Sequence, residues 1–181
     1  MRKSLLALSG IVALVALVAG GASWANWMHK GQTKVALPAV PGVKTSAGGD
    51  AVFDLSKDGK TLHYKLNLKN IENVTMAHVH AVGADGTPAA ILAWLDPVNG
   101  TAPSLRPGKF SGKLAEGSIT ADKLGGPLKG GTVKELFEKI EHGSAGVAVH
   151  TKQNGGGELW GVRKATKPET KDSSGESAPG Y

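Results

Sequence analysis

The most constraining feature of this sequence is a strict alternation of apolar and polar side chains over residues 61–68. Each even position of this run carries leucine or tyrosine, and each odd position carries a polar residue. Because successive side chains of a β-strand point to opposite faces, the run predicts a strand with one buried and one solvated face. The Asp58-Gly59 pair separates it from residues 51–55, which is typical of an antiparallel hairpin.

Further short apolar runs follow, and they are separated by many of the 26 glycines and 9 prolines. We expect strands within residues 71–82, 89–95, 109–117, 147–151 and 158–163, with residues 89–95 central because they are apolar on both faces. Only one helix is predicted, where Thr132 and Glu135 form a capping box and Gly143 ends the apolar periodicity. The pattern favours an all-β fold, an antiparallel Greek-key-like β-sandwich with one short helix.

The N-terminus has the features of a secretory signal. Arg2 and Lys3 precede an apolar run over residues 5–19, and small residues follow up to Ala25. We therefore predict a signal peptide over residues 1–25, a linker over 26–44, one β-sandwich domain over 45–163 and a disordered tail over 164–181. The protein is expected to be exported to the periplasm or the extracellular space, and an uncleaved signal would anchor it in the membrane.

Composition excludes several classes of function. The chain has no cysteine, so disulfides, thiolate metal sites and cysteine nucleophiles are all absent. Its formal net charge of +6 is spread thinly and includes Arg2 and Lys3, and no basic run with aromatic residues points to nucleic acid. The sequence shows no nucleophile elbow, paired carboxylates or phosphate loop, so a binding module is favoured over an enzyme.

Two histidines in one predicted strand are the strongest candidates for chemistry. His78 and His80 should point to the same face with Cα atoms about 7 Å apart. If residues 147–151 lie alongside, His150 supplies a third imidazole for copper or zinc. Met76 shares the face and would add a thioether that favours reduced copper. His63, on the polar face of a neighbouring strand, is an optional further metal ligand.

The same residues also have a simpler interpretation. The imidazoles could hydrogen-bond across strands, for example to Thr151 or Glu158, while Met76 fills the core. Glu158 either orients a ligand imidazole or accepts hydrogen bonds within its own turn. The expected pairing of Thr151 with Glu158 puts His150 on the face opposite Trp160, and we predict that Trp94 and Trp160 belong to the core.

Two stretches resemble a known family. Ala77-His78-Val79-His80, and later Val149-His150-Thr151 with the Gly-rich turn and Glu158-Leu159-Trp160-Gly161, resemble the CHRD domain, a module named after chordin and also found in exported bacterial proteins. The resemblance covers roughly residues 44–163, with Gly155 where members often carry proline. It implies an extracellular or periplasmic β-sandwich whose role in bacteria is poorly defined. The growth-factor binding of chordin-like proteins is not carried over.

The strand around His78 is also similar to the His-x-His copper strand of copper/zinc superoxide dismutases. The sandwich is therefore expected to be of the superoxide-dismutase-like or immunoglobulin-like kind. Three functions stay open. The first is a module that binds an unknown protein, a cell-surface partner, or a copper or zinc ion. The second is a redox protein of the dismutase type, and the third is a structural or adhesive module without a metal. A two-metal dismutase needs more histidines than the predicted domain contains.

Overall fold

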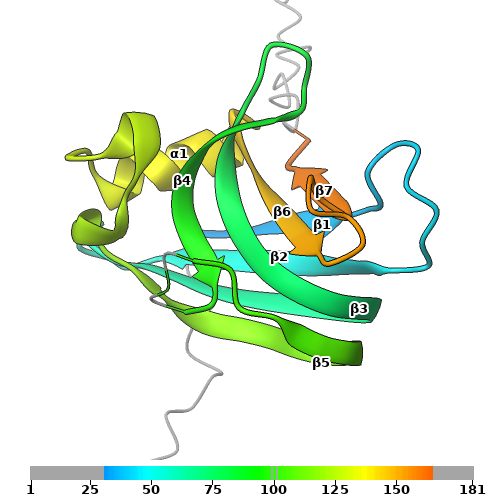
Figure 1. The fold of residues 1–181 in the computed structure, drawn as a ribbon. Helices are drawn as coiled ribbons and strands as arrows, with labels where there is room; N and C mark the ends of the chain where they lie inside the picture. Colours follow the sequence, from blue (N-terminus) through cyan, green and yellow to red (C-terminus); the bar gives the residue numbers. More distant parts are fainter. Residues whose placement is uncertain (1–30, 99, 101, 165–181) are drawn as a thin grey trace, which may run out of the picture.

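The computed structural model describes residues 31–98, 100 and 102–164, and the predicted signal peptide and nearly all of the predicted tail lie outside these ranges. Within the described residues, seven strands form one antiparallel sheet that curves into a nearly closed, sandwich-like arrangement with one short α-helix (Figure 1). The all-β prediction is confirmed. The elements are β1 Gln32–Leu37, β2 Gly48–Leu55, β3 Leu62–Val82, β4 Pro88–Asp96, β5 Arg106–Ile119, η2 Ala121–Lys123, η3 Gly126–Leu128, α1 Val133–Glu141, β6 Ala145–Thr151 and β7 Leu159–Val162.

The long strand β3 belongs to both layers of the fold. Its first half pairs with β2 on one side and β5 on the other, and its second half pairs with β6 and β4 (Figure 1). Between the halves, Asn70 and Asn73 have φ values of 52° and 56°, and the register with β5 shifts. Asparagine tolerates this left-handed backbone, and such irregularities increase local bend and twist. The chain therefore changes layers without leaving the sheet.

The first and last strands meet at the opposite side of the fold. The amide of Trp160 donates to the carbonyl oxygen of Pro38 at 3.1 Å, and Ala39 forms a bridge with Leu159. A Cβ on Gly161 would lie 2.0 Å from the carbonyl oxygen of Ala36, so only glycine permits this approach. The contact brings β7 against β1 and limits the exposed sheet edge.

The helix begins where the capping box predicts. The backbone amide of Glu135 donates to Thr132 Oγ1 at 3.2 Å, and the apolar side of α1 is buried. The helix packs mainly against β6 at one end of the sheet (Figure 1). Within the described ranges, none of the helices combines the length and the hydropathy of a membrane span.

The structure differs from the sequence-based expectations at three strands. Residues 32–37, assigned to the linker, form β1, because their alternating buried side chains pair with β2. Strand β5 is longer than residues 109–117. Strand β4 was expected to be central, but among the described strands it pairs only with β3. The chain near η3 lies beside β4, and the amide of Gly125 there donates to Leu92 O at 2.8 Å.

Candidate metal centre

The pairing of β3 with β6 brings three histidines to one face of the sheet. Met76 lies opposite His150 in this register, and His78 and His80 follow at alternate positions towards the end of β3. Directly opposite residues of an antiparallel pair project to the same side, so His150 joins the face of the His-x-His pair. One ring nitrogen from each of the three histidines lies within 4.8 Å of the others, and the group could hold a metal ion.

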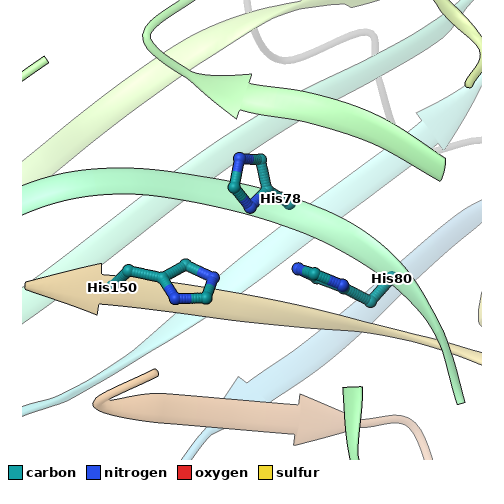
Figure 2. Close-up of side chains that lie close together, drawn as sticks. All are labelled: His78, His80 and His150. Carbon is teal, nitrogen blue, oxygen red and sulfur yellow. The ribbon is translucent and has the colours of Figure 1, made fainter. Parts of the chain in front are cut away.

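The three imidazoles form a compact triangle. The ring centroid of His78 is 5.3 Å from those of His80 and His150, which are 5.9 Å from each other. Figure 2 shows His78 above the gap between the other two rings, which point towards one another. The exposed fraction of the residue is only 1% for His78, 7% for His80 and 6% for His150. Histidine is not usually buried to this extent.

Two of the rings are oriented by backbone carbonyl groups. The Nδ1 of His80 is 2.8 Å from Ala89 O, and the Nδ1 of His150 is 2.9 Å from Gly155 O. Because a carbonyl oxygen can only accept, each Nδ1 must carry the hydrogen and donate it. In the neutral imidazole the lone pair then belongs to Nε2. Metal-ligating histidines are commonly fixed in this way by a partner at the second nitrogen.

The remaining ring nitrogens have no hydrogen-bond partner among the described residues. Buried and unpartnered are Nε2 of His80, Nε2 of His150 and both nitrogens of His78. A buried polar atom without a partner costs about 1–3 kcal/mol. Several of them at one place therefore need an explanation, and a bound cation would satisfy the lone pairs.

Burial also keeps these rings neutral. It lowers the pKa of His78 to about 3, with the neighbouring His150 and His80 lowering it further. Burial likewise lowers the pKa of His80 and of His150, although the hydrogen bonds to Ala89 and Gly155 act in the opposite direction. Desolvation disfavours the charged form of a base, so the lone pairs are available at neutral pH.

The structure places the other two predicted ligands, His63 and Met76, differently from the three histidines. His63 lies in the first half of β3, where its Nδ1 is 2.8 Å from Ser118 Oγ, and it does not belong to the three-histidine group. Met76 is the cross-strand neighbour of His150 and is half-buried. Its position on the histidine face agrees with the pattern of alternation.

The family model of the CHRD domain matches residues 30–162. The chain belongs to the CHRD family. No curated protein and no solved structure matches it. The matched range begins just before β1 and ends at the last residue of β7, so this CHRD domain includes the whole sheet and all three histidines.

The tryptophans of this CHRD domain lie beside the histidines and are half-buried, which corrects their assignment to the core. The ring of Trp94 stands edge-on to His78 with centroids 4.1 Å apart, and Trp160 is similarly perpendicular to His80 at 6.3 Å. The pairing of β6 with β7 places Trp160 opposite Ala148. This register differs by one residue from the expected one, and a one-residue shift moves a side chain to the other face.

Glu158 serves its own turn in the CHRD domain. Its Oε2 accepts from Thr151 Oγ1 at 2.7 Å and Asn154 Nδ2 at 2.9 Å, and its Oε1 accepts from Thr45 Oγ1 at 2.7 Å. These hydrogen bonds lower its pKa against the opposing effect of burial. With its oxygens engaged by these donors, Glu158 helps to position the turn that presents Gly155 O to His150.

Sequence reasoning missed the groups that orient the histidine rings. The acceptors for His80 and His150 are backbone carbonyl groups, which have no side-chain signature in a sequence. Trp94 is the direct partner of His78 in the pairing of β3 with β4, but that register is shifted on both sides of the pair and alternation alone does not give it. Trp160 required the correct register of the last hairpin.

Proposed function

We propose that this CHRD domain binds one copper or zinc ion through His78, His80 and His150. The observation that carries the proposal is the set of buried nitrogens that face one another without a hydrogen-bond partner in the described part of the chain. Hydrogen-bonded histidines that only support strands would direct both ring nitrogens to protein groups. Here the carbonyl groups of Ala89 and Gly155 each bind the Nδ1 of one ring, in His80 and His150 respectively. The Nε2 of each of these two rings is left for a ligand.

The donor set fits these metals. Neutral imidazoles are favourable ligands for zinc and copper, and three of them form a recurrent site with one open position. Nitrogens bound tetrahedrally at about 2.0–2.1 Å from a zinc ion lie about 3.4 Å apart. The three nitrogens lie within 4.8 Å of one another, so small ring rotations would bring them onto one ion.

The proposed location is outside the cytoplasm. The charged start, the apolar run over residues 5–19 and the small residues before Ala25 support export. In the periplasm or the extracellular space the domain would meet copper and zinc without cytosolic buffering. Metal binding there is also compatible with an additional protein or cell-surface partner.

Metal content of matched variants tests the proposal. The full chain and a His78→Ala/His80→Ala variant are exposed to equal copper or zinc, desalted and measured by elemental analysis. The control is His63→Ala/His142→Ala, which also removes two imidazoles but leaves the buried group intact. We expect about one ion per chain in the wild type and the control, and almost none in the site variant. Equal, substoichiometric metal in all three would contradict the proposal and favour a structural or adhesive module.

The loaded wild-type protein also distinguishes binding from turnover. The second candidate, a dismutase-type redox protein, rests on the open position that three ligands leave on the ion. Superoxide consumption that depends on His78 and His80 would support that candidate. A metal-loaded protein without such consumption would remain a binding module.

A further inference from the structure

The three-histidine group contains only neutral nitrogen donors among the described residues. Among the described residues, no carboxylate belongs to the group that could hold an ion. The carboxyl oxygens of Glu158 already accept hydrogen bonds from three side chains. Asp96 pairs with Ala77, which projects to the face opposite His78. The charge of a bound ion would therefore have no anionic ligand to offset it.

Two indole rings lie beside this group. Trp94 stands against His78, and Trp160 stands against His80. Trp160 is held in place by its Nε1–H, which donates to Gly86 O in the β3–β4 turn at 2.9 Å. It also lies over Gly146, where an added Cβ would come within 2.6 Å of the indole Cη2. The indole fits there because position 146 carries no side chain.

The charge of the ion determines how much free energy its transfer into this buried site costs. The cost of moving an ion from water into a low-dielectric site grows with the square of its charge, so a divalent ion pays about four times as much as a monovalent one. A divalent zinc ion with three protein ligands also needs a water or another donor at its fourth position. The burial of all three histidines and the flanking indoles disfavour both the second charge and the water.

The thioether of Met76 also favours a monovalent copper ion. Met76 is the one sulfur-containing residue among the described residues, because the other two methionines are at positions 1 and 28 and cysteine is absent. It pairs directly with His150, and the Cβ atoms of such partners lie about 4.5–5.5 Å apart. A flexible thioether at that position is close to the group, and thioethers select reduced copper.

We propose that the site selects copper in its +1 state over Zn²⁺ and Cu²⁺, and holds it with three imidazoles in a water-poor niche formed by Trp94 and Trp160. This inference rests on the proposed function, because it specifies which ion the same three histidines take. Trp160 acts as a positioning residue, and Met76 as a soft neighbour of the ion.

The affinities of the full chain for three ions test the selectivity. Cu⁺ is supplied without oxygen, with ascorbate as reductant and a chromophoric Cu⁺ chelator as competitor, while Zn²⁺ and Cu²⁺ are titrated against their own competitors. We expect Cu⁺ to bind at least about ten times more tightly than Cu²⁺, which raises the reduction potential of the bound couple by about 59 mV above that of aqueous copper. Equimolar Zn²⁺ should not displace Cu⁺.

X-ray absorption of the Cu⁺-loaded chain gives a readout that needs no variant. Three nitrogen scatterers, with or without one longer sulfur contact, support the inference, and four or more nitrogen or oxygen donors overturn it.

The variants Trp160→Phe and Met76→Leu should each lower the preference for Cu⁺ over Cu²⁺, while His63→Ala should leave it unchanged. A preference unaffected by both of the first two variants would overturn the roles assigned to them.

The possible failures are distinguishable. Zn²⁺ or Cu²⁺ bound as tightly as Cu⁺, with binding lost in His78→Ala/His80→Ala, would overturn the selectivity and leave the proposed function intact. Binding of none of the three ions, or equal binding by that variant, would overturn both. Circular dichroism of each variant shows whether the β-fold is retained.

Discussion

His80 and His150 lie on different strands, yet each donates its Nδ1–H to a backbone carbonyl oxygen and turns its Nε2 towards the other, with ring centroids 5.9 Å apart. Neither Nε2 has a hydrogen-bond partner among the described residues. Two rings that are fixed independently, with their Nε2 atoms facing each other, are preorganised for a shared ligand. Preorganisation reduces the cost of ordering the donors when an ion binds.

The metal-free protein should lose stability as the solution is acidified below about pH 6.5. The pKa of His78 is about 3 in the folded state, below the unfolded value near 6.5, so the unfolded chain binds protons first. The free energy of unfolding should fall by up to about 1.4 kcal/mol per pH unit for each such histidine. His80 and His150, whose pKa values are also lowered, add to the slope. Urea unfolding between pH 6.5 and 4.5 measures it, and a slope unchanged in His78→Ala/His80→Ala would contradict this origin.

Metal should stabilise the fold. An ion that binds only the folded state at a free concentration 100 times its Kd adds about 2.7 kcal/mol, which corresponds to a rise in Tm of roughly 10 °C. Thermal unfolding followed by circular dichroism should show this rise in the wild type and in His63→Ala. A chelator should reverse it. The same rise in His78→Ala/His80→Ala would show that the ion binds elsewhere.

Replacing His78 by leucine should stabilise the metal-free protein. Both ring nitrogens of His78 are buried and have no partner within residues 31–98, 100 and 102–164, so an apolar side chain of similar volume removes an unfavourable contribution of about 1–3 kcal/mol. The matched change His63→Leu should give no such gain, because it breaks the contact with Ser118. Denaturant midpoints of the two variants without metal give the comparison. A loss of stability in His78→Leu would contradict an unfavourable contribution from the buried imidazole.

Copper binding should quench the fluorescence of the tryptophans beside the site. Trp94 and Trp160 contact His78 and His80, whereas the remaining tryptophans of the chain, Trp24 and Trp27, precede the described residues. Emission titrated with copper should therefore fall in the wild type and change little in Trp94→Phe/Trp160→Phe. Trp24→Phe/Trp27→Phe is the matched control and should retain the quenching. The opposite pattern would place the ion near the N-terminus.

Local signals in the sequence were sufficient for much of the fold. The Asp58-Gly59 hairpin and the Thr132 cap depend on a few neighbouring residues, and both formed as predicted. The continuity of β3 depends on left-handed backbone at Asn70 and Asn73, which the sequence permits without requiring. Strand β1 was missed because it is followed by prolines, and its pairing with β2 is a long-range contact.

The candidate site was predictable only in part. Alternation alone placed His78 and His80 on one face, and the β6 pairing added His150. The side occupied by Trp160 was predicted incorrectly because the Gly-rich loop before β7 does not specify how many residues it contains. The carbonyl groups of Ala89 and Gly155 depend on tertiary structure, since any residue supplies the same acceptor.

The most direct measurement is anomalous diffraction at the copper and zinc absorption edges from crystals of the loaded protein. The account predicts one strong peak, about 2.0–2.1 Å from Nε2 of His80, Nε2 of His150 and one ring nitrogen of His78. A peak at another place, or no peak while the three rings keep their metal-free positions, would contradict a metal centre at this face.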